Sequence, residues 1–358
     1  MSVSTGIHGT GQVVVAEFLE SPGRRYLFGA TPCAAAIASV LPVVGIIDDR
    51  IDATSFHGLP ILRSESVPAD ALVVATTIGR PGTARRYLLS RGFRHCDFFA
   101  FERCSGLNLP PVRFWTGFSK AAVENPHEID LLRKRMADRI SLETLDAIVS
   151  FRLSADSAHL DHFQERQQEQ YFEDFLELRR HGEVFFDVGG FDGENSRRFM
   201  ELCPDFSGIQ IFEPDPANRR TILARLAEHP RVQLHAHGLG DINGEFRFSS
   251  SGSVSAFCES GDLAVPVKRL DDCNPGPVSF LKMDIEGGEI PALRGARRTV
   301  KKWKPRMAIC VYHEPDDLWN IAGEVLAIHS DYSVFLRHYT EGVTETVMFF
   351  VPPQVCVP

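Results

Sequence analysis

The fold is decided by the stretch Val184-Phe-Phe-Asp187-Val-Gly189-Gly190-Phe-Asp192-Gly193-Glu-Asn-Ser196. An apolar run typical of a buried strand ends in an aspartate and a glycine-rich turn, and a helix is predicted to begin near Ser196. Ligands of open α/β sheets bind at the carboxyl ends of the strands, where glycines allow close approach and positive φ angles. An acid there suits a cationic, amine-bearing ligand better than a pyrophosphate. The cofactor-binding residues predicted from this stretch are Asp187, Gly189, Gly190, Asp192, Gly193 and Ser196.

Acids also follow the next two predicted strands. In Ile209-Gln-Ile-Phe212-Glu213-Pro214-Asp215, Glu213 ends the strand, where a carboxylate can accept hydrogen bonds from both hydroxyl groups of a ribose. Asp215 fits better at the start of the following helix, where negative charge is favourable. Gly238-Leu-Gly240-Asp241 is predicted to form a loop on the same edge. There Asp241 either reaches the amino group of adenine or only forms the turn.

Ionisable side chains gather after two later strands, in Lys282-Met-Asp284-Ile-Glu286-Gly287-Gly288-Glu289 and in Val311-Tyr312-His313-Glu314. Such groups perturb each other's pKa values, and histidine can act as a base near neutral pH. We predict Asp284 or His313 as the general base, with Lys282 and Glu286 orienting that base or the substrate. The alternative is structural, with His313 in the core and Glu289 as a helix-start charge. We expect no bound metal, although Asp284, Glu286 and His313 could offer oxygen and nitrogen ligands to a divalent ion.

Around these motifs, the C-terminal half contains five predicted strands and a final pair. Apolar strands that alternate with helices favour a parallel sheet. The last two strands are joined too closely for a crossover helix, so they must form an antiparallel hairpin at the sheet edge. The predicted strands are 184–188, 208–212, 232–236, 279–283, 306–311, 332–336 and 346–351, which is the layout of a class I methyltransferase.

The first hundred residues predict a second, smaller Rossmann-like α/β domain. Its predicted strands are 25–29, 43–47, 71–75 and 97–101, and its predicted helices are 32–41 and 82–91. The turn at Gly29 lacks the G-x-G-x-x-G pattern, but Asp48 and Asp49 end the second strand at the position that holds a ribose in dinucleotide sites. The domain either binds a nucleotide or sugar nucleotide or is a packing or substrate-presenting module without its own ligand, and the weak glycine turn favours the second hypothesis.

Residues 110–180 show no convincing strand and are charged and helix-rich, with predicted helices at 128–136 and 164–178. We interpret them as a helical connector that also packs on the C-terminal domain. The predicted organisation is therefore a Rossmann-like domain at 1–109, the connector at 110–180 and the domain that carries the site motifs at 181–358.

Composition limits the kinds of partner and the compartment that we expect for this protein. The 358 residues carry a formal net charge of −9, which argues against a nucleic-acid partner. The basic run 294–304 has the spacing of a solvated helix face, with contact to a phosphate or an anionic substrate as the alternative. The eight cysteines form no C-x-x-C pair, so a reducing cytoplasm fits better than a disulfide framework or a zinc site. We see no signal peptide, and the longest apolar stretch, 34–47, is too short for membrane insertion. The oligomeric state stays open.

The runs FDVGGFDGENS, IFEPDPAN, GLGD, FLKMDIEGGEIPALRGA and VYHEP together resemble the FkbM family of methyltransferases, in the family's order, over residues 170–353. KMDIEGGE with the trailing LRGA is the most specific element. The resemblance implies a class I fold, S-adenosylmethionine as methyl donor, and O-methylation of sugars or secondary-metabolite hydroxyls. Gly190 stands where many relatives carry alanine, a change we expect to be harmless for the turn. Gln170-Tyr171-Phe172 resembles a segment that precedes the domain in some relatives, which implies that Tyr171 is a lid on the cofactor.

Three functions remain at this point. The favoured one is a cytoplasmic O-methyltransferase of a sugar, glycan or related small molecule, in polysaccharide biosynthesis. The N-terminal sequence resembles small Rossmann-like domains of bacterial polysaccharide-modifying enzymes. One alternative is a non-catalytic nucleotide-binding scaffold or sensor, against which the complete acid set of Asp187, Glu213 and Asp284 counts. The other is an NAD(P)-dependent sugar-modifying enzyme, against which the missing glycine pattern and the lack of a Y-x-x-x-K pair count.

Overall fold

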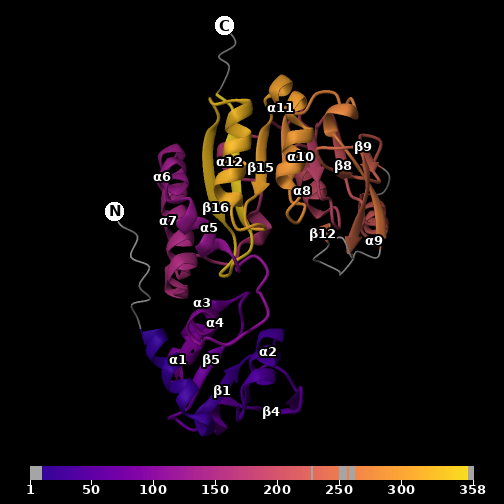
Figure 1. Cartoon of the computed structure of the whole chain (residues 1–358). Coiled ribbons are helices and arrows are strands. Elements are labelled where there is room, and N and C mark those ends of the chain that lie inside the picture. Colours follow the sequence, from indigo (N-terminus) through magenta and orange to yellow (C-terminus); the bar gives the residue numbers. More distant parts are fainter. Residues whose placement is uncertain (1–9, 227–228, 250–255, 258–262, 354–358) are drawn as a thin grey trace. The chain divides into compact units, whose positions relative to one another are not determined.

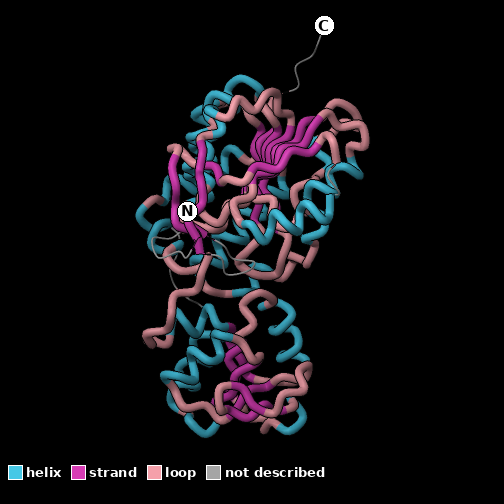
Figure 2. Tube along the Cα trace, turned by 90° about the vertical axis from the view of Figure 1, so that its right-hand side faces the viewer, coloured by secondary structure: helices cyan, strands magenta, loops and turns pink. Residues whose placement is uncertain are grey.

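The computed structural model describes residues 10–226, 229–249, 256–257 and 263–353 (Figure 1). The chain divides into two compact units, each discontinuous in sequence. The N-terminal unit comprises Met1–Val123, Glu143–Gln167 and His338–Glu345, and the C-terminal unit comprises Glu124–Leu142, Gln168–Arg337 and Thr346–Pro358. Each unit contains its own largely parallel sheet, with helices around the strands (Figure 2).

A seven-stranded sheet forms the centre of the C-terminal unit, in the order β16-β17-β15-β14-β7-β8-β9. Its strands are β7 (Val184–Val188), β8 (Gly208–Phe212), β9 (Val232–His235), β14 (Phe280–Met283), β15 (Arg306–Cys310), β16 (Ser333–His338) and β17 (Thr346–Val351). The first five are parallel, and β17 pairs antiparallel with β15. The predicted parallel sheet with a C-terminal hairpin at one edge is therefore confirmed.

Aromatic side chains form the core beside the central strands. The ring of Phe185 on β7 stacks on Phe280 of the neighbouring β14, with 5.1 Å between centroids, and on Phe199 of helix α8, at 4.7 Å. All three rings are fully buried, as expected for central strands of a parallel sheet that is covered on both faces. The helices that follow the strands are α8 (Glu194–Leu202), α9 (Pro216–Leu226), α10 (Glu289–Gly295), α11 (Arg297–Trp303) and α12 (Asp317–Ile328).

A second, four-stranded sheet in this unit was not predicted. It has the order β10-β13-β11-β12, with β10 (Gly238–Leu239), β11 (Gly244–Ser249), β12 (Ala256–Phe257) and β13 (Leu263–Lys268). The prediction of a loop from Gly238 was wrong for its first two residues, because they pair with Val267 and Lys268 of β13. Gly240 and Asp241 follow this short strand.

The segment before β7 differs from its prediction. Helices α5 (Phe118–Glu124), α6 (Pro126–Arg135) and α7 (Arg139–Ser154) form as the composition indicates. The predicted helix at 164–178 was wrong, since the segment holds only the 3₁₀ turns Gln167–Glu169 and Asp174–Leu176. Its apolar residues pack on strands instead: Phe172 lies against Phe185 and Phe280, and Phe175 stacks on Phe335, with 4.2 Å between centroids.

The N-terminal unit contains a six-stranded sheet in the order β3-β4-β2-β1-β5-β6, parallel except for the pair β3–β4. Its strands are β1 (Arg25–Phe28), β2 (Gly45–Ile47), β3 (Ser55–Phe56), β4 (Leu59–Leu62), β5 (Leu72–Ala75) and β6 (Arg94–Asp97), and its main helices are α1 (Thr10–Glu20), α2 (Pro32–Val40), α3 (Pro81–Ser90) and α4 (Phe98–Cys104). The strand predicted at 97–101 was wrong. Asp97 ends β6 and caps α4 by accepting a hydrogen bond from the Ala100 N–H at 2.8 Å, so the aromatic run is the first turn of that helix.

Two further features concern the whole described chain. Among the described residues, no helix has the length and apolar character that crossing a bilayer requires. The six cysteines within the described ranges are thiols rather than halves of disulfides.

Candidate active site

The loop after β7 runs very close to the end of β14. Gly189 has a φ of +80°, and a Cβ atom added there would lie 1.9 Å from the backbone oxygen of Asp284, so only glycine fits. Gly193 also has a positive φ, +81°, and begins α8. Gly190 does not need a positive φ, so the turn itself would accept alanine as we expected. An added Cβ would nevertheless lie 2.3 Å from Cγ2 of Ile211, so the packing leaves no room for it.

Beneath this loop lies a buried ion pair. Nζ of Lys282 is 3.2 Å from Oδ1 of Asp187, and their side chains are 2% and 0% exposed. Lys282 also donates to the backbone oxygens of Val188 and Gly189, and Ser196 donates to Oδ2 of Asp187 at 2.8 Å. Burial disfavours the ammonium ion, but Asp187 and Asp284 outweigh that penalty and raise the pKa of Lys282. Lys282, Asp187 and Ser196 therefore hold the glycine loop in place through these contacts. Lys282 stays cationic.

Glu213 links the loops that follow β7 and β8. Its carboxylate accepts hydrogen bonds from the N–H groups of Phe191 and Asp215, both at 2.8 Å. Burial raises the pKa of this carboxyl group, although those amides favour its ionised form. Asp215 accepts from the Ala217 N–H at 2.6 Å at the start of α9, the role expected for it. The Asn218 side chain also bonds to this carboxylate, and carboxylate oxygens can accept further hydrogen bonds from ligand hydroxyls.

The two other acids predicted to bind the cofactor lie in different surroundings. Asp192 accepts from the Glu194 N–H at 3.0 Å and pairs with Arg225 at 2.8 Å, so its carboxylate joins the loop to α9. Asp241 is exposed directly after Gly240, whose N–H bonds to the Lys268 carbonyl at 3.0 Å. Among the described residues, Asp192 and Asp241 therefore make no direct hydrogen bond to Glu213 or Asp284.

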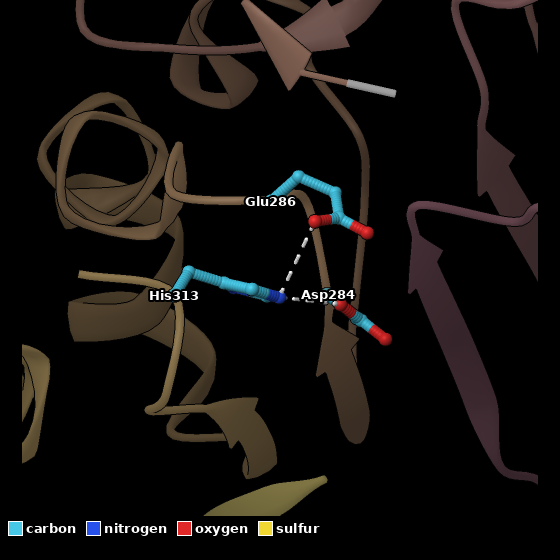
Figure 3. Close-up of side chains that lie close together, drawn as sticks. All are labelled: Asp284, Glu286 and His313. Carbon is cyan, nitrogen blue, oxygen red and sulfur yellow. Dashed lines mark ion pairs between the residues drawn. The ribbon is translucent and has the colours of Figure 1, made fainter. Parts of the chain in front are cut away.

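Three of the four predicted catalytic residues, Asp284, Glu286 and His313, come together around one imidazole ring (Figure 3), whereas Lys282 pairs with Asp187. Nε2 of His313 lies 3.4 Å from Oδ1 of Asp284 and 3.8 Å from Oε2 of Glu286, and its Nδ1 lies 2.9 Å from Oε1 of Glu289. Glu289 also accepts from the N–H groups of Ile285 and Gly287 at 2.8 and 3.0 Å, which closes the loop between β14 and α10. The helix-start role considered for Glu289 therefore coexists with a direct contact to His313.

The charges in this cluster separate the two predicted base candidates. Burial opposes the imidazolium, but Glu289, Asp284 and Glu286 outweigh it and raise the pKa of His313 to about 10. Burial likewise opposes the Asp284 carboxylate, but Lys282, His313 and Tyr171 lower its pKa. At neutral pH both ring nitrogens of His313 are therefore protonated, so this residue cannot accept a proton. Asp284 is ionised and can accept one.

Tyr171 joins this cluster from a distant part of the sequence. Its hydroxyl donates to Oδ2 of Asp284 at 2.7 Å and lies 3.4 Å from Sγ of Cys310. Tyr171 is only 3% exposed, so its side chain lies in the interior of the site beside Asp284. The sequence carried no signal for the contacts of Tyr171 with Asp284 and Cys310.

Two groups of side chains have the spacing of metal ligands. The ligand atoms of Asp284, Glu286 and His313 lie within 4.8 Å of one another, as do those of Glu289, His313 and Asp317. Both groups share His313, and its positive charge between carboxylates accounts for the clustering. Metal binding requires a neutral imidazole, so an ion at either group would have to displace the proton that the surrounding acids hold on His313.

In the N-terminal unit, Asp49 and the polar groups near the ends of β1 and β5 bond to other residues of the same unit. Asp49 accepts from the Ser64 N–H at 2.8 Å and from the Tyr87 hydroxyl, and Thr31 and Thr76 bond to each other across the ends of β1 and β5 at 2.9 Å. The N-terminus of α3 is occupied by Glu341, which accepts from the Thr83 N–H at 2.6 Å. Within this unit, these contacts occupy the Asp49 carboxylate and the N-terminus of α3.

Comparison with known proteins agrees with this geometry. Residues 187–336 match the family described as Methyltransferase FkbM domain. The crystal structure of methyltransferase FkbM from Methylobacillus flagellatus KT is 27% identical and superimposes with a TM-score of 0.79 over 98% of this chain and 96% of that one. The 2-O-methyltransferase NoeI of Sinorhizobium fredii is 25% identical over 35% of this chain, a match that spans 62% of NoeI. The match to the FkbM methyltransferase domain covers residues 187–336, and the structural similarity to an FkbM methyltransferase covers nearly the whole chain.

Proposed function

We propose that this chain is an S-adenosylmethionine-dependent O-methyltransferase that acts on a hydroxyl group of a sugar, a glycan or a related small molecule. The observation that carries the proposal is the position of Asp284. It ends β14 against the glycine loop and holds its two carboxylate oxygens toward His313, at 3.4 Å, and Tyr171, at 2.7 Å. This is a fixed, ionised acceptor at the edge of the sheet where ligands of such folds bind.

The residues present suit the proposed cofactor. S-adenosylmethionine would supply an electrophilic methyl group next to a sulfonium. Because residue 189 is a glycine, the backbone of the loop lies directly against the backbone of Asp284, with no side chain between them. Glu213 offers carboxylate oxygens for ribose hydroxyls, and the ring of Phe191, which is 49% exposed beside it, offers an apolar surface. In this proposal Asp187 and Lys282 act indirectly, by holding the loop.

Asp284 is the proposed general base, because His313 is already protonated. A hydroxyl is a weak nucleophile until its proton leaves, and a positioned base contributes about 10²–10⁴-fold. In the proposed reaction Oδ1 of Asp284 accepts the hydroxyl proton, and the His313 cation orients this oxygen and limits the build-up of negative charge with Glu286. The resemblance to the family supports a sugar hydroxyl as acceptor, and the similarity to the 2-O-methyltransferase NoeI supports transfer to oxygen. A cytoplasmic role in polysaccharide biosynthesis is part of the same proposal.

Binding and transfer can be tested separately. Calorimetric titration with S-adenosylhomocysteine should show at least about tenfold weaker binding to Glu213→Ala, because two hydroxyl hydrogen bonds are lost. Glu201→Ala, on an exposed side chain of α8 that pairs with Arg197, is the matched control and should bind normally. Unchanged binding to Glu213→Ala would reject the proposed cofactor position.

The acceptor is tested with methyl-labelled S-adenosylmethionine and a panel of methyl glycosides of hexoses, 6-deoxyhexoses and hexuronic acids. The wild type should transfer label to oxygen in at least one class, as shown by NMR of the product. Asp284→Asn should lower kcat by about 10²–10⁴-fold and leave the Kd for S-adenosylhomocysteine near that of the wild type. Substantial transfer by Asp284→Asn would show that the base lies elsewhere.

A further inference from the structure

We propose that Tyr171 is a positioning residue for Asp284: its hydroxyl fixes one carboxylate oxygen so that the other stays directed at His313 and the acceptor. The inference rests on the proposed function, because it assigns Tyr171 a task in that site. Tyr171 precedes the family match at 187–336, so the segment before the domain contributes to the centre of the site.

The two oxygens of Asp284 have different partners. Oδ2 accepts from the Tyr171 hydroxyl at 2.7 Å, whereas Oδ1 lies 3.4 Å from Nε2 of His313. The short, charge-assisted bond restricts rotation of the carboxylate. Without the hydroxyl, the group could rotate and offer either oxygen to His313, so the acceptor oxygen would lose its fixed position.

The surroundings hold Tyr171 itself in one place. Its φ is +73°, a conformation that a bulky aromatic residue adopts only when neighbouring contacts impose it. The side chain is buried, Nζ of Lys282 lies 5.4 Å from the ring centroid, and the adjacent Phe172 packs on Phe185 and Phe280. The segment around Tyr171 therefore holds the hydroxyl in position to donate to Asp284.

The charges around Asp284 indicate what loss of this hydroxyl does. Asp284 faces Lys282 on its own strand, His313 and Cys310 from β15 and the loop after it, and Tyr171, while Glu286 acts on it through His313. Burial raises the pKa of Asp284, and Lys282, His313, Tyr171 and Cys310 lower it. Removing only the hydroxyl leaves both cations in place, so the carboxylate stays ionised at neutral pH but becomes easier to protonate.

The test compares Tyr171→Phe with Tyr332→Phe in the full chain. Both variants keep the ring and lose one buried hydroxyl bond, but the Tyr332 hydroxyl donates to the Pro305 carbonyl at 2.8 Å, away from Asp284. Carbon-13 NMR of protein labelled at aspartate Cγ, with Asp284→Asn for assignment, measures the Asp284 pKa without turnover. In Tyr171→Phe, the Asp284 pKa should rise by about one pH unit, and the acid limb of the kcat–pH profile should move up by the same amount. The kcat should fall about tenfold, and the Kd for S-adenosylhomocysteine should stay unchanged.

Tyr332→Phe should leave the Asp284 pKa and the pH profile as in the wild type. The inference is overturned if Tyr171→Phe also leaves them unchanged, or if both variants change them equally, which would indicate a general structural effect. The NMR result is independent of the acceptor. If the Asp284 pKa shifts but Asp284→Asn still transfers methyl groups, the Tyr171 contact stands and the proposed base is rejected.

Discussion

Replacing Lys282 by methionine tests what the buried ion pair does for the glycine loop. Methionine has a similar length and no charge, so it leaves the Asp187 carboxylate, which is 0% exposed, without its partner 3.2 Å away. Breaking a buried pair from one side costs about 3–5 kcal/mol, because an uncompensated charge remains. The variant also loses the donor to the Gly189 carbonyl, so we expect weaker binding of S-adenosylhomocysteine in addition to the lost stability.

The double variant Lys282→Met with Asp187→Asn separates charge from packing. It removes both charges, so its loss of unfolding free energy should be about 2 kcal/mol or less, well below the sum of the two single losses. Urea titrations of all four proteins, monitored by tryptophan fluorescence, give these values. A loss below about 1 kcal/mol in Lys282→Met, or strict additivity in the double variant, would refute the argument that the pair holds the loop.

Three further predictions concern the same edge of the sheet. His313→Gln should be least stable relative to the wild type below pH 6.5, and the difference in Tm should vanish as the pH rises toward about 10, because a raised pKa stabilises the fold only while the folded histidine is protonated; a difference independent of pH contradicts this. Gly190→Ala should cost about 1–3 kcal/mol in a urea titration, because its Cβ would meet Ile211 at 2.3 Å. Gly208→Ala, without a positive φ and with no atom closer than 3.9 Å to the added Cβ, is the control and should cost clearly less. EDTA should not reduce methyl transfer, since His313 is held as a cation, and activity lost to EDTA and restored by magnesium would contradict that charge assignment.

The order of acids and glycines along the sequence was sufficient to predict the C-terminal sheet. β7, β8 and β17 have the predicted bounds, because an apolar run that ends in an acid or a turn residue marks both a buried strand and its end. Asp284 and His313 could be expected to meet, since the carboxyl ends of the neighbouring parallel strands β14 and β15 share one edge.

Other features depend on contacts that a linear pattern does not contain. The aromatic run after Asp97 fits a strand as well as a helix, and only the capping bond to Ala100 decides for the helix. Tyr171 and Asp284 are 113 positions apart, and no periodicity links them. His313 was a plausible base until Glu289, Asp284 and Glu286 were found around its ring.

The hairpin tip has a consequence for biosynthesis. Residues His338–Glu345 belong to the N-terminal unit, where Glu341 accepts from the N–H and hydroxyl of Thr83 at 2.6 and 2.9 Å. The N-terminus of a nascent chain leaves the ribosome first, so N-terminal domains generally fold first. Here α3 obtains its capping carboxylate only after the 258 positions that separate Thr83 from Glu341 have been synthesised. Until then the nascent protein carries an open helix end, so folding of the first unit is completed only after most of the C-terminal unit has been synthesised.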